Sequence, residues 1–278
     1  MNVIVAKSAG FCWGVRRAVE TARKTAESSG TTVFTDGPLI HNSHMMQRLE
    51  DSGVKESSQP SSLPSKATLI VRAHGIPPDR RTALETLPLH LVDATCPDVA
   101  KIQRIIQENA AKGRTILVLG DPGHAEVIGL LGYAGAYGRV VTSPQDIAKL
   151  PSDLQHVCLV SQSTQSEKTF AETAEAVLCK FRDATIVNTI CNSTRNRQAE
   201  LVVLAATCEV FVVVGSPASA NTQRLAQIAS DLRPTFVVDS AEELSSAAFA
   251  PFTTVGVTAG ASTPDFIIEK VTERLKSF

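Results

Sequence analysis

The sequence predicts an α/β protein with mostly parallel sheets, and three observations lead to this prediction. Short runs of apolar and β-branched residues alternate along the chain with segments of helical periodicity. The apolar runs are nearly continuous, which is typical of parallel strands that are covered on both faces. Residues that favour helix starts, such as Pro97 and Thr263, stand where several helical segments begin. Alternation of this kind favours parallel sheets with helices packed on their faces.

Individual elements follow from the same patterns. Strands are expected at Asn2–Ala6, Thr68–Ala73, Thr115–Gly120, His156–Ser161, Glu209–Gly215, Thr235–Val238 and Thr253–Thr258, with Thr32–Thr35 also extended. Helices are expected at Gly14–Ser28, Pro97–Ala111, Glu167–Phe181, Thr194–Thr207, Asn221–Leu232 and Thr263–Lys276. The polar segment Glu56–Ser65 is expected to be a loop.

Composition sets limits on the class of protein. The 278 residues are 43% hydrophobic and 20% charged, which suits a soluble globular protein of one to three domains. The net charge of −1 argues against partners such as nucleic acids or membrane surfaces. No apolar run reaches the roughly 20 residues of a spanning helix. The amino-terminal residues are typical of a strand and not of a targeting peptide, so we expect a cytoplasmic protein.

Three of the six cysteines stand out because they lie far apart, one in each third of the chain. Cys12, Cys96 and Cys191 each sit in a turn beside Gly, Pro or Ser/Thr and directly precede a helical segment, where a thiolate is stabilised. Zinc ribbons and ferredoxins instead place their cysteines close together in sequence. Three similar α/β units could each offer one thiolate to a shared centre. The spacing leaves open whether that centre is iron–sulfur or zinc.

The cysteine positions and the similar unit lengths suggest domain boundaries. We expect domains at residues 13–95, at 96–190, and at 191–278 together with 1–12. The other cysteines have a plainer interpretation. Cys158 and Cys208 lie in or beside apolar runs and Cys179 lies on a helical pattern, so all three are expected to be small core residues.

Polar side chains gather where the predicted strands end. In parallel α/β sheets, ligands bind beyond the carboxyl ends of the strands. Free helix N–H groups there attract anions. The sequence therefore favours an anion pocket, although each Ser, Thr or Asn could be only a helix cap. The residues concerned are His41, His74, Ser163, Thr164, Ser219, Asn221 and Ser262. No Walker A or GxGxxG sequence occurs, which disfavours an ordinary nucleotide fold.

His124-Ala125-Glu126 has the H-x-E pattern of zinc deaminases, but the P-C-x-x-C that those enzymes also need is absent. Glu126 remains a candidate general acid, because negative charge from a cluster and a bound anion would raise its pKa. The alternative is an ordinary surface glutamate.

Motifs distributed over nearly the whole chain resemble the 4-hydroxy-3-methylbut-2-enyl diphosphate reductase family of the LytB type. They stand at Gly10–Val15, His41–Asn42, Ala73–Gly75, Asp93–Pro97, Gly123–Val127, Gln162–Thr164, Ile190–Cys191, Thr194–Gln198, Ser219–Asn221 and Thr258–Ser262. The resemblance implies three α/β domains around one central [4Fe-4S] cluster that is bound by Cys12, Cys96 and Cys191. One departure is Ala220, which stands where a second serine is usual in the family.

The same resemblance implies the residue roles and the reaction. The diphosphate would be held by His41, His74, Ser219, Asn221 and Ser262, and the organic end of the substrate would be lined by His124, Glu126, Ser163, Thr164 and Thr194. Reductive dehydroxylation would give isopentenyl and dimethylallyl diphosphate, the last step of the non-mevalonate isoprenoid pathway. Glu126 would supply a proton, and a ferredoxin or flavodoxin would supply electrons. The alternatives are an aconitase-like hydro-lyase, a non-catalytic iron–sulfur sensor and a zinc hydrolase.

Overall fold

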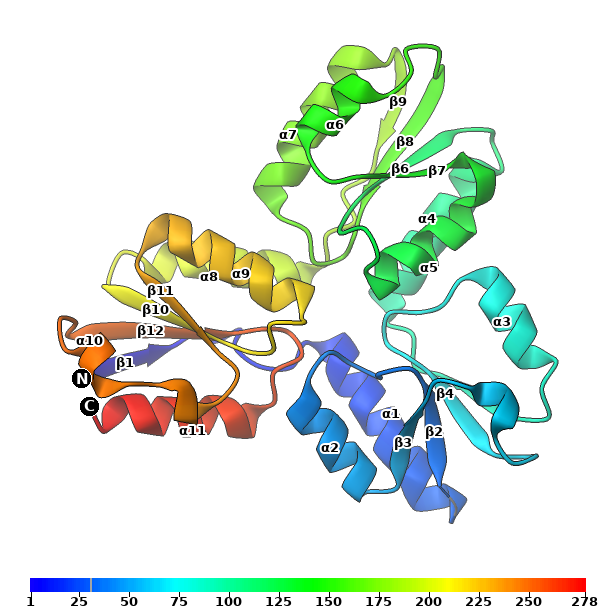
Figure 1. Cartoon of the computed structure of the whole chain (residues 1–278). Helices are drawn as coiled ribbons and strands as arrows, with labels where there is room; N and C mark the ends of the chain where they lie inside the picture. Colours follow the sequence, from blue (N-terminus) through cyan, green and yellow to red (C-terminus); the bar gives the residue numbers. More distant parts are fainter. Residues whose placement is uncertain (31) are drawn as a thin grey trace. The chain divides into compact units, whose positions relative to one another are not determined.

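The computed structural model describes residues 1–30 and 32–278 and contains three four-stranded parallel sheets (Figure 1). Their strand orders are β1-β12-β10-β11, β3-β2-β4-β5 and β7-β6-β8-β9, and every pairing is parallel. The predicted parallel α/β class is therefore confirmed. The strands are β1 Asn2–Val5, β2 Val33–Asp36, β3 Val54–Ser57, β4 Thr68–Val71, β5 His90–Asp93, β6 Thr115–Leu119, β7 Gly138–Val141, β8 His156–Ser161, β9 Asp183–Ile186, β10 Val210–Val214, β11 Thr235–Val238 and β12 Thr254–Ala259.

Helices connect the strands, as parallel pairing requires. The α-helices are α1 Trp13–Ser29, α2 Ser43–Asp51, α3 Pro78–Glu85, α4 Pro97–Ala110, α5 Ala125–Ala134, α6 Pro144–Lys149, α7 Glu167–Lys180, α8 Asn192–Leu204, α9 Ala220–Leu232, α10 Ser246–Phe249 and α11 Asp265–Lys276. Short 3₁₀ helices are η1 Pro60–Ser62, η2 Gly135–Tyr137 and η3 Ala241–Glu243.

The chain divides into two compact units. Unit 1 comprises residues 1–16, 40–47 and 192–278, and it contains the sheet β1-β12-β10-β11. Unit 2 comprises residues 17–39 and 48–191, and it contains the other two sheets. The three sheets fit three α/β domains, whereas the exact boundaries given above stay a prediction.

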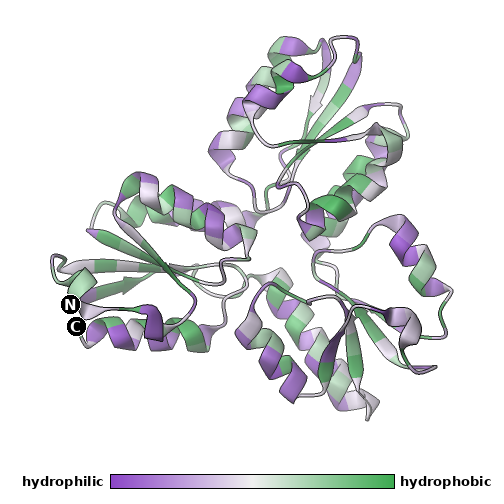
Figure 2. Ribbon diagram, in the orientation of Figure 1, coloured by the Kyte–Doolittle hydropathy of each residue, from purple (hydrophilic) through white to green (hydrophobic). Residues whose placement is uncertain are grey.

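Unit 1 is a three-layer sandwich. Helices α8 and α9 cover one face of its sheet, and α10 and α11 cover the other (Figure 1). Alternate residues of β10 serve the two faces: Val212 and Val214 pack with α11, and Phe211 and Val213 pack with α8 and α9. Strand β10 is apolar throughout (Figure 2), because neither of its faces meets water.

Unit 2 repeats this construction. The sheet β7-β6-β8-β9 has α4 and α5 on one face, against Ile116 and Val118, and α7 on the other, against Leu117 and Leu119. In the sheet β3-β2-β4-β5, α3 contributes Leu84 to a cluster with strand β4. Each sheet thus carries an apolar core and leaves its carboxyl edge to polar loops.

Four strands lie outside the expected elements, and each is at the edge of its sheet: β3, β5, β7 and β9. They are short and only partly buried, so the continuous apolar signal of a central strand is missing. The expected loop Glu56–Ser65 is corrected for the same reason, since Glu56 and Ser57 complete β3 and Pro60–Ser62 forms η1.

Helices α2, α3, α5, α6 and α10 also lie outside the expected segments. They are short, between 4 and 10 residues, so periodicity along the sequence has little length in which to show. Among the described residues, no helix has both the length and the apolar character needed to cross a membrane.

Candidate functional site

The carboxyl edge of the unit 1 sheet carries Cys12 in the loop after β1. The Cys12 N–H donates to the Ala261 carbonyl oxygen at 3.0 Å, which joins this loop to the one after β12. Cys12 directly precedes α1, and the N–H of Val15 donates to its Sγ at 3.4 Å. A sulfur atom at a helix amino terminus is favoured as the thiolate. The predicted link between this cysteine and a helix start is therefore confirmed.

Two side chains of α8 hold the loop that leads to Cys12. The Arg197 guanidinium, which is buried, donates to the Gly10 carbonyl oxygen at 2.5 Å. The Glu200 carboxylate accepts from the backbone N–H groups of Lys7 and Ser8 at 2.6 and 2.9 Å, and from the Ser8 hydroxyl. Partial burial alone would raise the pKa of Glu200. The hydrogen bonds from Ser8 and Lys7 outweigh that effect, so the pKa is lowered. Helix α8 thus positions the segment that carries the cysteine.

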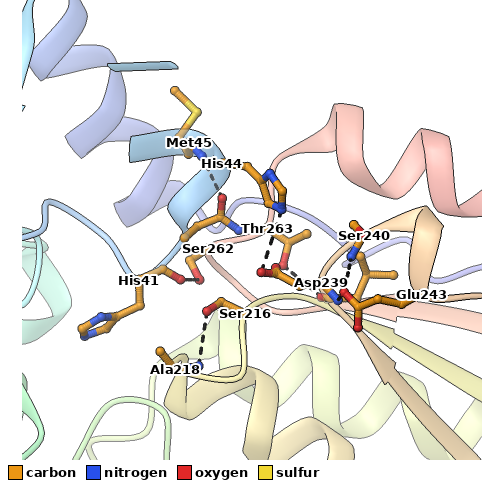
Figure 3. A network of polar contacts seen from close by, with 12 residues as sticks. His41, His44, Met45, Ser216, Ala218, Asp239, Ser240, Glu243, Ser262 and Thr263 are labelled. Atoms are coloured by element: carbon orange, nitrogen blue, oxygen red, sulfur yellow. Dashed lines mark hydrogen bonds and ion pairs between the residues drawn. The ribbon is translucent and has the colours of Figure 1, made fainter. Parts of the chain in front are cut away.

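The other predicted residues of unit 1 form a connected polar network. The Asn221 Oδ1 accepts from the Ala261 N–H at 3.0 Å, and its Nδ2 lies 3.5 Å from the Thr194 Oγ1. The Ser262 hydroxyl lies 3.1 Å from the His41 carbonyl oxygen and 3.4 Å from the Ser219 hydroxyl. Figure 3 shows His41, Ser262 and Ser216 around the ends of these loops. The structure therefore brings Thr194, Ser219, Asn221, Ser262 and His41 to one edge.

Helix α9 begins at this edge and approaches the strands closely. Its N-cap, Ser219, accepts from the Thr222 N–H, as a capping residue does. A Cβ atom at Gly215 or Gly260 would clash with the Thr222 Oγ1, and Gly215 has a φ of 147° that other residues rarely adopt. Glycine at both positions therefore lets the helix amino terminus and its N–H groups reach the pocket edge.

Unit 2 contributes a buried carboxyl group, Glu126, from the first turn of α5. Its side chain is 2% exposed. The Ser163 N–H donates to Glu126 Oε1 at 2.6 Å and the Ser163 hydroxyl donates to Oε2 at 2.8 Å. Ser163 follows β8, so two different connections of the same sheet meet here. The alternative of a surface glutamate is wrong.

Burial raises the pKa of Glu126 to about 7, because a carboxylate loses its hydration there. The two hydrogen bonds from Ser163 act in the opposite direction, and the nearby charge of Asp121 raises the pKa further. Glu126 can therefore both hold and release a proton near neutral pH, which is what a general acid requires.

Histidines lie beside this carboxyl group. His124 is the N-cap of α5, and its Nδ1 accepts from the Glu126 N–H at 3.2 Å. The rings of His74 and His124 meet edge to face with centroids 5.5 Å apart. The Thr164 hydroxyl accepts from Gln162 Nε2 at 3.0 Å, and Gln162 Oε1 accepts from the Asp121 N–H at 2.9 Å. His74, His124, Glu126, Ser163 and Thr164 all follow strand ends of unit 2.

Cys96 and Cys191 also belong to unit 2, and both directly precede helices. Cys96 is the N-cap of α4, and its N–H donates to the Ala73 carbonyl oxygen at 2.9 Å, next to His74. The Cys191 N–H donates to the Ser163 carbonyl oxygen at 3.0 Å, and α8 starts at the next residue. Both cysteines are thereby tied to loops that carry other predicted site residues.

The burial of the other three cysteines agrees with the prediction for two of them. Cys158 and Cys208 are buried, as predicted, whereas Cys179 is exposed and the prediction of a core residue was wrong. Cys179 lies on α7, one of whose faces meets solvent, and the helical pattern did not distinguish the two faces.

The polar residues that support the site lie largely outside the predicted set. Gln162, Arg197 and Glu200 bond to backbone groups that are distant in sequence, and Gln162 also donates to the nearby Thr164. Gln162 and Arg197 stand in the motifs Gln162–Thr164 and Thr194–Gln198, but the sequence predicted no role for them, and Glu200 lies outside every motif. Their partners could not be named before the fold was known.

The chain was compared with known proteins. The family described as LytB protein matches residues 3–276. A protein from Opitutus terrae named 4-hydroxy-3-methylbut-2-enyl diphosphate reductase is 44% identical over 289 residues, which span 100% of both chains. The solved structure of the E-1-hydroxy-2-methyl-but-2-enyl-4-diphosphate reductase from Plasmodium falciparum is similar with a TM-score of 0.94 and 28% identity, over 99% of this chain and 88% of that one.

A second solved structure is described as (E)-4-hydroxy-3-methyl-but-2-enyl diphosphate reductase, the terminal enzyme of the non-mevalonate pathway. It is 37% identical over 100% of both chains, with a TM-score of 0.73.

Proposed function

Because the chain belongs to the LytB family, we propose that it reduces 4-hydroxy-3-methylbut-2-enyl diphosphate to isopentenyl and dimethylallyl diphosphate. This is the last step of the non-mevalonate isoprenoid pathway. The reaction takes up two electrons and two protons, breaks the allylic C–O bond and releases the hydroxyl oxygen as water. The observation that carries the proposal in this chain is the buried Glu126 carboxyl group, which can hold a proton near neutral pH.

We assign the cofactor as one [4Fe-4S] cluster held by Cys12, Cys96 and Cys191. All three are of intermediate exposure, lie outside any disulfide and stand at helix starts, and thiolate is the donor that iron–sulfur clusters require. When bound, such a cluster supplies single electrons and, at an iron without a protein ligand, a Lewis-acid position. The residues present therefore fit the group that the family implies.

The diphosphate is assigned to Ser219, Asn221, Ser262 and His41 in unit 1, and to His74 in unit 2. Hydroxyl and amide groups beside the amino terminus of α9 supply hydrogen bonds to an anion without titrating themselves. Protonated histidine adds a cationic donor. Anchoring the diphosphate would orient the allylic hydroxyl and so lower the entropic part of the barrier.

The proton for the departing hydroxyl is assigned to Glu126. Its hydrogen-bonded partner is the Ser163 hydroxyl, so a proton relay from Glu126 would run through Ser163. His124, Ser163, Thr164 and Thr194 are assigned to the organic end of the substrate. The hydrogen bonds of Glu126 keep its carboxyl group in one orientation while the proton is transferred.

The remaining assignments concern the electron donor, the compartment and the macromolecular partners, and they rest on the family, the net charge and the amino-terminal sequence. The electron donor is a ferredoxin or flavodoxin type of protein, since the cluster accepts single electrons. The compartment is the cytoplasm. Neither a nucleic acid nor a membrane is a partner.

Anaerobic purification tests this proposal directly. We expect iron and acid-labile sulfide in about equal amounts, little zinc, and conversion of the substrate to both products only when a reductant such as reduced methyl viologen is present. Turnover without a reductant would instead indicate a hydro-lyase, and zinc with no sulfide would indicate a zinc hydrolase. A cluster-loaded protein that leaves the substrate unchanged with reductant present would contradict the activity.

A further inference from the structure

A separate cavity of about 340 Å³ lies in unit 2 beyond the carboxyl ends of β2, β3 and β4. These strands belong to one parallel sheet, and helix α3 begins beside them (Figure 1). None of the residues assigned to the reaction lines this cavity. Its place in the sheet is nevertheless one where α/β proteins bind ligands, and its volume is in the range of small-molecule sites.

Arg72 provides the cation of this cavity. Within residues 1–30 and 32–278, its Nε is buried and has no hydrogen-bond partner. Gly37 has a φ of 74°, and a Cβ atom there would lie 3.3 Å from the Arg72 Nη1, so the guanidinium lies against the glycine backbone. A buried guanidinium N–H without an acceptor costs free energy, so Arg72 is an incompletely satisfied cation at the wall of the cavity.

A second arginine, Arg80, is already paired. It donates to the Asp36 carboxylate at 2.6 and 3.4 Å, so the charges of these two residues compensate each other. Glu56 also lines the cavity and is exposed. Because Glu56 is exposed, water screens its negative charge, and it opposes an anion at Arg72 less than a buried carboxylate would.

Neutral donors complete the lining. Ser57 and Ser58 offer hydroxyl groups, and α3 begins with Pro77 as its N-cap, which provides no side-chain cap. Pro77 and Pro78 have no N–H and Asp79 adds a carboxylate to the first turn, so this helix start contributes little beyond the positive end of its dipole. A guanidinium and two hydroxyls together suit an oxyanion with several acceptor oxygens.

We propose that this cavity binds the phosphate group of a small phosphomonoester, with Arg72 as its main partner. The site lies outside the residues assigned to the diphosphate substrate, so it would bind a second metabolite.

Titration calorimetry with inorganic phosphate tests the proposal on the full-length protein. Wild type is compared with Arg72→Gln and with Arg139→Gln, a matched change at an exposed arginine on β7 that does not line the cavity. We expect saturable phosphate binding that Arg72→Gln weakens at least ten-fold and Arg139→Gln leaves unchanged. Arg72→Lys should give an intermediate loss, because it keeps the charge but not the planar fork.

Two further measurements accompany the titration. Thermal unfolding identifies an Arg72 variant that fails to fold, and in that case crystals of wild type soaked in tungstate replace the titration, with an anomalous peak expected beside Arg72. Absence of saturable phosphate binding, or binding that Arg72→Gln leaves unchanged, overturns the proposal. Equal affinity for acetate at matched ionic strength overturns the assignment to phosphate.

Discussion

The carboxyl edge of the unit 1 sheet and that of the β7-β6-β8-β9 sheet in unit 2 are built on the same plan but carry different chemistry. In unit 1 the assigned residues are mainly neutral hydrogen-bonding groups that are fixed by one another, as in Asn221 with Ala261 and Ser262 with Ser219. In unit 2 the central group is the titratable Glu126, with His124 next to it.

This difference shows that the same α/β architecture can support two tasks, anion binding and proton exchange. Neutral donors at a helix start bind an anion equally well over a wide range of pH. A buried carboxyl group has a pKa near 7 and can exchange a proton at physiological pH. We infer that unit 1 mainly binds substrate and that this edge of unit 2 mainly handles the proton.

The largest effect is expected for the cysteines, which occur in both units. Cys12→Ser in unit 1 and Cys96→Ser in unit 2 should each abolish turnover and lose most of the bound iron, because a cluster with two cysteine ligands is poorly held. Iron and sulfide analysis after anaerobic reconstitution measures this loss. Cys179→Ser, at an exposed cysteine, is the control and should keep wild-type iron. Full iron content in either ligand variant would contradict the assignment.

The second largest effect is expected on the chemical step, for a substitution in unit 2. Glu126→Gln should lower kcat about 100-fold or more, while leaving the cluster spectrum and KM nearly unchanged, because the amide keeps the contacts to Ser163 but cannot supply a proton. Single-turnover kinetics with a reduced cluster measures the chemical step. The control, Glu172→Gln on the exposed face of α7, should behave as wild type. Normal kcat in Glu126→Gln would remove this residue from the role.

A smaller effect is expected in unit 1. Asn221→Ala removes the acceptor for the Ala261 N–H, and we expect a loss of about 1–3 kcal/mol, or roughly 5- to 150-fold, in kcat/KM, mostly as a higher KM. Ser230→Ala, near the other end of α9, should change neither constant. A drop in kcat without a change in KM would indicate that unit 1 also acts in the chemical step.

The last prediction concerns stability against pH and leaves turnover aside. Because the folded pKa of Glu126 is raised from 4.5 to about 7, the folded protein binds the proton more tightly than the unfolded chain does. The free energy of unfolding should therefore fall as pH rises from about 4.5 to 7, by at most about 3 kcal/mol from this group. Urea unfolding of the apoprotein at pH 5 and pH 8 measures it. Glu126→Gln should lack this part of the pH dependence, and parallel curves for the two proteins would contradict the shift.

Much of the fold could be predicted, because buried parallel strands are apolar along their whole length. The central strands β4, β6, β8, β10 and β12 all lie within predicted segments or overlap them closely. The edge strands β3, β5, β7 and β9 escaped prediction because their partial burial leaves a mixed pattern, and only their pairing with a central strand makes them strands.

In the candidate site, too, some features could be predicted from the sequence and others could not. The order of polar residues after each strand placed Ser163, Ser219 and Ser262 at sheet edges, since the carboxyl ends of parallel strands lie together. The sequence could not show that Arg197 reaches the Gly10 carbonyl oxygen, because the two residues are 187 positions apart. Such supporting contacts depend on which helix packs beside which loop.

By itself, the sequence determined the α/β class, the central strands, and the position of three cysteines directly before helices, because these depend on local pattern and chain order. Only the tertiary structure decided that Glu126 is buried against Ser163 and that Arg72 faces a cavity beside Gly37. The physical reason is that burial and electrostatic environment come from residues distant in the chain. The local sequence around a glutamate does not show whether its carboxyl group is exposed to water or buried. Its pKa depends on that environment.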